Sequence, residues 1–291
     1  MDFSLSLFGN AVVSGLLLGG FYAAVTIGIS ISFGMLDIAN IAHPAFLVLG
    51  SYCAWLANAR LGVDPIAASI VLMPAFYLLG GGIYQLYHHA FERRGDASLR
   101  GLAFFFGLLF ITEVGLILAF GVDYRLVRAA YIGPSFYLGE LEFPLRLLVP
   151  AVVALALVAA LWAWLSRSFI GRAILAVAQD PEALRLMAAD PRRIKRIAFA
   201  LSIATASVGG AILIVIQPVQ PSIGRDYIGR VFAIAVLGGL GSFAGTVVAA
   251  MTLGIMESLT ATFYGPSWSP AVAFGFLLIA LAVKPSGVFG R

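Results

Sequence analysis

The chain has 291 residues, of which 61% are hydrophobic and only 11% are charged, and its mean hydropathy is +1.00. A soluble domain carries roughly 25% charged residues, because its surface needs polar cover, so the composition indicates a protein surrounded mostly by lipid. The formal net charge of +4 does not indicate a nucleic-acid partner, because the basic residues lie in short loops between apolar runs, where they set orientation in a membrane.

Eight apolar runs follow one another along the chain. A spanning helix needs about 20 mostly apolar residues, and lipid leaves the backbone no hydrogen-bond partner outside its own helix. The residues at 102–110 do not alternate in polarity as a membrane β-barrel requires. We therefore predict an all-α, polytopic membrane protein with about eight segments, at 9–33, 41–58, 65–87, 101–121, 147–165, 197–216, 229–262 and 268–284.

These runs form a single predicted transmembrane domain over 1–291, since the longest stretch outside them, 166–196, is shorter than the roughly 50 residues of a separate domain. The first run has no basic residues before it, so it is expected to be a permanent span and not a cleaved signal. The single Cys53 excludes an intrachain disulfide and a cysteine-based metal cluster.

Twelve of the 18 Lys and Arg residues lie in the loop 88–100, in the loop 166–196 and at the C-terminus. The side richer in these residues is expected to be cytoplasmic. The loop 122–146 is then outside, and so is the N-terminus.

The run 229–262 is too long for one ordinary span, and Gly238-Gly239-Leu240-Gly241-Ser242 and Gly245 interrupt it. A segment that enters, breaks at the glycines and returns would keep the basic C-terminus inside, so this topology is favoured. Broken helices occur at membrane depth only where they are buried in protein or line a cavity. The glycines could equally serve close helix packing, and both interpretations remain open.

A weaker interruption lies in the first half of the chain, over 34–44, and contains Asp37, Asn40, His43 and Pro44. Interrupted segments in both halves are the pattern expected at a binding site between internal repeats, so we state an internal two-fold repeat as a hypothesis. Asp37 and His43 lie near the predicted cytoplasmic boundary, where water could hydrate them.

The loop 166–196 holds a short predicted helix. Asp180 is suited to cap free amides and Pro181 to begin a helix, while Glu182 places negative charge in the first turn. Asp190-Pro191 then ends this helix and begins the next. The apolar side chains of the short helix are Ala183, Leu184, Leu186 and Met187. Exposed apolar side chains indicate a partner, although the helix could also pack on its own bundle or lie on lipid headgroups.

Four motifs in order resemble the branched-chain amino-acid permease family of ABC importers over nearly the whole chain. The loop, with Gly171-Arg172-Ala173 and Ala176-Val177-Ala178-Gln179-Asp180, is similar to the ATPase-docking loop of that family. One departure is Pro44, where the family commonly has Gly. The other motifs lie at Gly19–Ala23 with Phe33–Leu36 and Asn40–His43, at Val236–Ser242 and at Lys284–Gly290.

The resemblance implies an inner-membrane importer in which two permease chains, identical or homologous, pair with each other. Each would dock an ABC ATPase inside, and a periplasmic binding protein would deliver the solute. The solute would be a branched-chain or hydrophobic amino acid or a related small polar solute, because the family also serves urea, amides and aromatic acids. The expected docking residues are Gly171, Arg172, Asp180, Pro181, Glu182, Leu184 and Met187.

The chain offers no nucleotide site of its own. A P-loop requires Gly-Lys followed by Ser or Thr, and the two lysines, Lys195 and Lys284, follow Ile194 and Val283. Any ATP-driven transport must therefore use a separate ATPase, and the chain is not expected to be an enzyme. No cofactor is predicted, and the three histidines show no spacing that predicts a metal site.

Polar residues inside the apolar runs are the candidates for the substrate pathway. A carboxylate at membrane depth usually faces a partner or a cavity, although a hydrogen bond to another helix is the alternative. Hydroxyl and amide groups could bind a polar solute or serve helix packing. The candidates are Asn40, His43, Glu113, Gly239, Ser242, Thr246 and Glu257.

Two other classes of protein compete with the importer subunit. A secondary transporter driven by an ion gradient also explains broken helices and a buried carboxylate such as Glu113, but not the capped apolar helix in the loop. A membrane enzyme would need catalytic carboxylates or histidines clustered near one membrane face, whereas the acidic residues are scattered.

Overall fold

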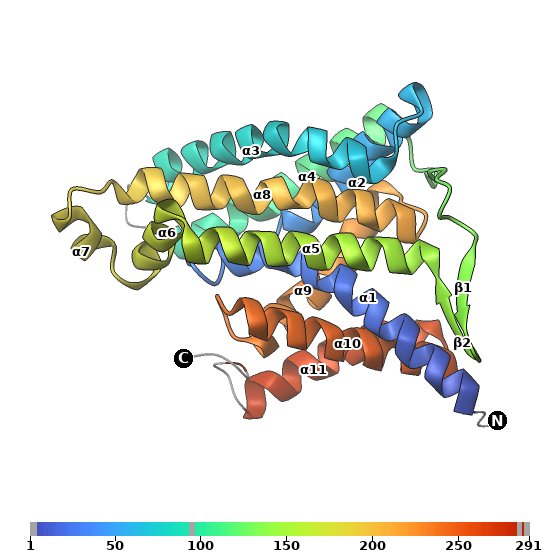
Figure 1. The fold of residues 1–291 in the computed structure, drawn as a ribbon. Helices are drawn as coiled ribbons and strands as arrows, with labels where there is room; N and C mark the ends of the chain where they lie inside the picture. The colour runs from blue at the N-terminus through green and yellow to red at the C-terminus, as the bar shows by residue number, and fades with distance from the viewer. Residues whose placement is uncertain (1–4, 93–96, 284–286, 288–291) are drawn as a thin grey trace.

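The computed structural model describes residues 5–92, 97–283 and 287, and its architecture is a bundle of helices (Figure 1). Six helices of the described part are long and apolar enough to span a membrane. These are α1 (Leu5–Ser32), α3 (Pro65–Ala90), α4 (Ala97–Phe120), α5 (Leu145–Arg167), α8 (Pro191–Ile216) and α10 (Phe243–Phe263). The predicted all-α polytopic fold is therefore confirmed.

Three further helices complete the bundle: α2 (His43–Leu61), α9 (Gly224–Gly238) and α11 (Ser269–Val283). They fall outside the six candidate spans, so the count of eight segments stays a prediction. Two single-turn 3-10 helices, η2 (Pro221–Ile223) and η3 (Pro266–Trp268), precede α9 and α11.

The two ends of the bundle differ. One end carries an antiparallel hairpin that sequence analysis did not predict, β1 (Ser135–Leu138) and β2 (Leu141–Pro144), in which Phe136 pairs with Phe143. The opposite end carries α6 (Phe169–Gln179) and α7 (Pro181–Leu186) (Figure 1). The Asn10 side chain near the start of α1 accepts a hydrogen bond from the Glu142 backbone at 2.8 Å. α1 therefore begins at the hairpin end, on the same side as the loop 122–146; that this side faces outward stays a prediction.

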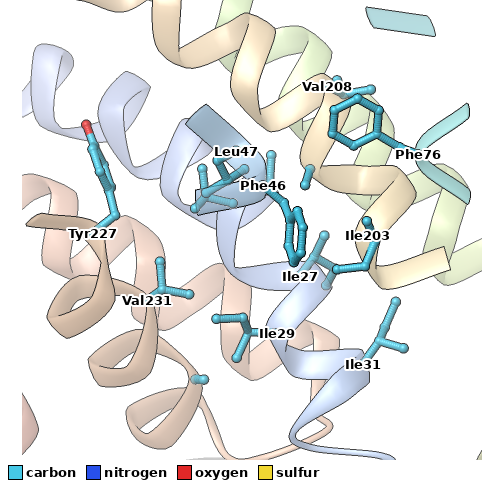
Figure 2. Close-up of a cluster of buried hydrophobic side chains, with 14 of the residues drawn as sticks. Ile27, Ile29, Ile31, Phe46, Leu47, Phe76, Ile203, Val208, Tyr227 and Val231 are labelled. Atoms are coloured by element: carbon cyan, nitrogen blue, oxygen red, sulfur yellow. The ribbon is translucent and has the colours of Figure 1, made fainter. Parts of the chain in front are cut away.

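The centre of the bundle is formed by α1 and α8. In the most apolar 18-residue stretch of each helix, 67% of the α1 residues and 89% of the α8 residues are buried, against 22% of the α4 residues. Isoleucines of α1 meet side chains of α2, α3, α8 and α9 in one apolar cluster (Figure 2). Small residues allow close helix approach: a side chain on Gly19 would lie 2.6 Å from the Met251 Cα of α10. The outer helices expose large apolar side chains such as Ile111 and Leu118, as lipid-facing helices do.

The long run 229–262 is broken as predicted. α9 ends at Gly238, α10 begins at Phe243, and the two helices pack on each other. A side chain on Gly245 would overlap the carbonyl oxygen of Gly238, so these glycines serve the break and close packing together. The basic residues Lys284 and Arg291, on which the topology argument partly rested, lie outside the described residues.

Candidate functional site

The two chain interruptions meet each other. α1 ends at Ser32 and α2 begins at His43, while the second break covers 239–242. A side chain on Gly34 would overlap the backbone nitrogen of Gly241, so the breaks are in direct backbone contact. Gly239 and Gly241 have φ values of 89° and 80°, a conformation that glycine adopts without a steric penalty. The two halves of the chain therefore contribute to one region, which we call the break region (residues 33–42 and 239–242).

Hydroxyl groups beside the break region link α1 to α10. The Ser30 and Thr246 hydroxyls lie 2.8 Å apart. The Ser242 hydroxyl accepts a hydrogen bond from the Gly245 backbone at 3.1 Å and so caps α10. Of the predicted pathway residues, Gly239, Ser242 and Thr246 thus lie together, and the two hydroxyl residues already perform structural tasks.

Asn40 and His43 are fully buried. The Asn40 Oδ1 accepts from the Ala42 backbone at 3.1 Å, but among the described residues the Asn40 Nδ2 and both His43 ring nitrogens make no hydrogen bond of good geometry. A buried polar group without a partner costs about 1–3 kcal/mol. Such groups require an explanation, and one explanation is a ligand or water that these side chains bind in another state.

The structure agrees with the expected hydration for Asp37 and contradicts it for His43. Asp37 is exposed, but His43 is 0% exposed. The imidazole lies between α1 and α8, since a side chain on Gly28 would overlap it and would lie 2.7 Å from the Thr205 Oγ1. Proximity to a predicted loop did not reveal this burial, because α2 folds back against helices that are distant in the sequence.

The two carboxylates at membrane depth are both paired with arginines of α9. Arg225 Nη2 lies 2.6 Å from Glu113 Oε1 of α4, and Arg230 Nε lies 2.9 Å from Glu257 Oε1 of α10. The Tyr22 hydroxyl of α1 also donates to Glu257. The Glu257 and Arg230 side chains are only 3% and 14% exposed, whereas the Arg225 side chain is 52% exposed. Each carboxylate therefore makes the interhelical contact that was the alternative to a pathway role.

The buried pair belongs to a longer polar chain. The Arg230 guanidinium lies 5.5 Å from the ring centre of Tyr227, and the Tyr227 hydroxyl accepts from Gln217 Nε2 at 2.6 Å. These contacts join α9 to α1, α10 and the end of α8. Sequence analysis missed the arginines as partners, because nothing local relates them to carboxylates on other helices. The available signal was that Arg225 and Arg230 flank the start of an apolar run.

The capping signals in the loop 166–196 are confirmed. The Glu182 and Ala183 backbone amides donate to Asp180 Oδ1 at 2.9 and 3.0 Å, and Pro181 is the first residue of α7. Asp190 accepts from the Arg192 amide at 2.9 Å at the start of α8. The helix is shorter than the expected 181–189, since it ends at Leu186 and the chain turns at Ala188 with a φ of 58°.

The apolar side chains of α7 divide into two groups. Leu186 and Met187 are 89% and 79% exposed, whereas Leu184 is 8% exposed. Leu184 lies in an apolar groove of about 620 Å³ between α6, α7 and α8. Leu184 therefore packs on the bundle, Leu186 is exposed, and Met187 is exposed while also bordering the groove; contact with a partner stays a prediction. Leu186, which was absent from the expected docking residues, presents the largest exposed apolar side chain of α7.

Gly171 and Arg172 lie in the first turn of α6. The Gly171 amide donates to the Ser168 hydroxyl at 2.9 Å, which caps this helix. A side chain on Gly171 would overlap the Leu165 backbone, so glycine permits the sharp turn from α5 into α6. Arg172 is exposed and lines the apolar groove, and Glu182 is exposed on α7.

A family model described as "Branched-chain amino acid transport system / permease component" matches residues 11–281. The chain belongs to this family. The resemblance read from the four motifs is therefore confirmed, and the chain is a multi-pass permease component of the inner membrane.

Two named relatives match over almost their full length, and a third over 67% of its own length. The permease protein BraD of the high-affinity branched-chain amino acid transport system of Pseudomonas aeruginosa is 29% identical, covering 96% of this chain and 95% of BraD. LivH from Escherichia coli K12 is 26% identical, with coverage of 98% and 96%. LivM from the same strain, another permease protein of such a system, is 26% identical, with coverage of 92% and 67%.

One solved structure has a similar fold, a chain of PsaBC from Streptococcus pneumoniae in complex with Fab. Its TM-score is 0.51 at 15% identity, and the match covers 96% of this chain and 92% of that one. At this identity the likeness concerns the fold alone, which agrees with the predicted helical architecture.

Proposed function

We propose that this chain is the membrane-spanning permease subunit of an ATP-binding-cassette importer. Its solute would be a branched-chain or hydrophobic amino acid or a related small polar solute. The chain would act as a single transmembrane domain over 1–291. The observation that carries the proposal is α7, a capped helix with two exposed apolar side chains, in a chain whose sequence has no P-loop.

The docking surface would be formed by the exposed part of α7. Leu186 and Met187 would enter an apolar pocket of the ATPase, and Glu182 would contact its rim. Leu184 would act from within, because its packing into the apolar groove fixes α7 to α6 and α8. Asp180 and Pro181 would hold the start of the helix, and the first turn of α6, with Gly171 and Arg172, would set the direction of the loop.

The substrate pathway would pass beside the break region. Irregular backbone at membrane depth requires burial or a cavity, and both breaks come together here. Asn40 and His43 would supply the unpaired polar groups for a solute, while Gly239, Ser242 and Thr246 would shape the opposite wall. Glu113 and Glu257 would hold α9 in place beside it through their arginine partners.

The proposal requires partners that family membership implies. A second permease chain, identical or homologous, would complete the channel; that E. coli K12 has both LivH and LivM as permease proteins of such systems favours a homologous one. Two ABC ATPase subunits would dock on the α7 end, and a periplasmic binding protein would deliver the solute at the hairpin end.

A secondary transporter driven by an ion gradient is the second candidate, because it also uses buried carboxylates. In this structure both carboxylates are paired with arginine. Binding of a proton or a sodium ion by Glu113 or Glu257 would first break an ion pair. This pairing favours the importer subunit.

The deciding experiment changes the exposed face of α7. Leu186→Asp with Met187→Asp should abolish co-purification of the ATPase and ATP-dependent uptake, because two charges would have to enter an apolar interface. Leu61→Asp, at a leucine of the hairpin end that is also largely exposed, is the control and should retain the ATPase. Full uptake by the α7 variant would contradict the proposal and favour the secondary transporter.

A further inference from the structure

A second cleft opens at the α7 end, on the other side of the loop from the apolar groove. Its volume is about 380 Å³, and α3, α7 and α8 all contribute to its walls. Tyr84 and His88 come from α3, Arg185 from α7, and Arg192 and Lys195 from the first turns of α8. None of its lining residues belongs to the apolar groove or to the break region, and the cleft joins the loop to two helices of the bundle.

Among the described lining residues one carboxylate, Glu92, lies in this cleft, and both of its oxygens are already engaged. Its Oε1 accepts from Lys195 Nζ at 2.6 Å, and its Oε2 accepts from the Tyr84 hydroxyl and contacts His88 Nδ1, both at 2.8 Å. Burial alone would raise the pKa of Glu92, but the hydrogen bonds from Lys195 and His88 and the Lys195 charge outweigh it and hold the pKa below its ordinary value. Glu92 therefore neutralises Lys195 and leaves the two arginines uncompensated.

The guanidinium of Arg185 has no hydrogen bond or ion pair within residues 5–92 and 97–283. The Arg192 guanidinium has only a 3.4 Å contact with His89 Nε2, and the nearby Asp190 carboxylate is occupied as the cap of α8. Counted over its described lining residues, the cleft thus holds three cations against one carboxylate. By contrast, the arginines of α9 each have a carboxylate partner.

The position and chemistry of the cleft indicate its ligand. It lies where α3 ends and α8 begins, at the end of the bundle that the distribution of Lys and Arg predicts to be cytoplasmic. Arginine matches the geometry of phosphate oxygens through paired N–H donors, and basic pockets between spanning helices on this side bind anionic headgroups. Small-molecule sites are typically about 300–1,000 Å³, so the cleft has room for a phosphate and its substituent.

We propose that this cleft binds a phosphate-bearing anion, through Arg185 and Arg192. The source is either the headgroup of an anionic phospholipid or a free phosphate compound. Because Arg185 lies on α7 and Arg192 at the start of α8, a bound phosphate ties the docking helix to the bundle. The proposal holds whether or not α7 docks an ATPase.

The test uses the full-length chain in detergent and native mass spectrometry with phosphatidylglycerol, phosphatidylcholine and inorganic phosphate as probes. Wild type should retain phosphatidylglycerol in preference to phosphatidylcholine, or bind inorganic phosphate. Arg185→Gln with Arg192→Gln should lose roughly tenfold or more of this binding, since each basic residue contributes substantially to anion affinity. Arg193→Gln with Arg196→Gln removes the same charge from the same turns of α8 but outside the cleft, and should bind like wild type.

The two sources are separated by the probes. Saturable binding of inorganic phosphate without lipid identifies a free anion, whereas retention of phosphatidylglycerol that inorganic phosphate does not displace identifies a headgroup. Wild type that binds neither probe selectively would overturn the proposal, and so would equal losses in both double variants. If the glutamine variant is not monodisperse, Arg185→Lys with Arg192→Lys replaces it; this variant keeps the charge without the paired donors and should show a smaller loss of the same binding.

Discussion

The loop between α5 and α8 and the helix pair α9–α10 both interrupt apolar sequence, but different forces hold them. In the loop, Asp180 and Asp190 accept hydrogen bonds from amides two or three residues away. In the helix pair α9–α10, Arg230 pairs with Glu257 across 27 positions in the sequence, and Arg225 pairs with Glu113 of α4 across 112 positions. Local capping therefore shapes the first region, and tertiary contacts shape the second.

This difference predicts where the molecule tolerates change. A cap contributes about 1 kcal/mol, and its loss frays one helix end. A buried ion pair or a backbone-to-backbone contact joins several helices, so its loss affects the bundle as a whole. Substitutions in the helix pair α9–α10 should therefore act on folding, and those in the loop on partner binding.

The largest effect is expected from Gly245→Ala. The new methyl group would overlap the Gly238 carbonyl oxygen, and neither backbone can move away without separating α9 from α10. We expect a loss above about 5 kcal/mol, which would exhaust the stability of a typical domain. The yield of monodisperse protein measures it. Gly115→Ala on α4, where no described atom beyond the neighbouring residues and the backbone of its own helix lies within 4 Å of the added group, should fold normally. Equal yields of the two variants would contradict the prediction.

The next largest effect is expected from Glu257→Leu. It leaves Arg230 buried without its carboxylate partner, which costs about 3–5 kcal/mol, and the midpoint of thermal unfolding in detergent should fall strongly. Adding Arg230→Met removes the stranded charge and should recover much of the loss. If the double variant is no more stable than the single one, the ion pair is not what holds α9.

Asp180→Ala tests the loop in the same terms. Two amides at the start of α7 would lose their acceptor, at a local cost of about 1 kcal/mol. Hydrogen exchange at residues 181–187 should accelerate, and ATPase association should weaken, while the unfolding temperature stays unchanged. A large drop in that temperature would show that the loop, like the helix pair α9–α10, is coupled to the whole bundle.

Glu113→Leu repeats the Glu257 substitution at the more exposed pair. Because the Arg225 side chain is half-exposed, its charge remains solvated, and we expect a loss of about 1 kcal/mol or less. Thermal unfolding beside Glu257→Leu measures the contrast. Equal losses for the two variants would mean that burial does not determine the strength of these pairs.

The smallest effect concerns pH. The pKa of Glu92 in the folded protein is held below its ordinary value of 4.5. A depressed pKa contributes stability above the unfolded value, and this contribution is lost as pH falls through the folded pKa. The unfolding temperature of wild type should therefore approach that of Glu92→Gln as pH falls below 4.5. A constant difference between the two would contradict the role of this carboxylate.

The predictable part of the candidate site was the part encoded by neighbouring residues. The start of α7 followed from Asp180-Pro181, and the broken segment followed from its glycines together with the count of basic residues. The division between buried Leu184 and exposed Leu186 did not follow, because an apolar patch on a short helix does not state which side faces the bundle. The hairpin β1–β2 was missed for a similar reason, since each strand has only four residues and lies between the long apolar runs.

The sequence by itself determined that this is a helical membrane protein, where its chain is interrupted, how its loop helices are capped and which family it belongs to. Those properties rest on composition, on contacts within a few residues and on motifs in order. Only the tertiary structure decided that the two interruptions touch, that His43 is fully buried and that Glu113 and Glu257 are held by arginines of α9. Helices in lipid recognise one another by small residues and paired polar groups brought together from distant positions, and no local pattern records which of these will meet.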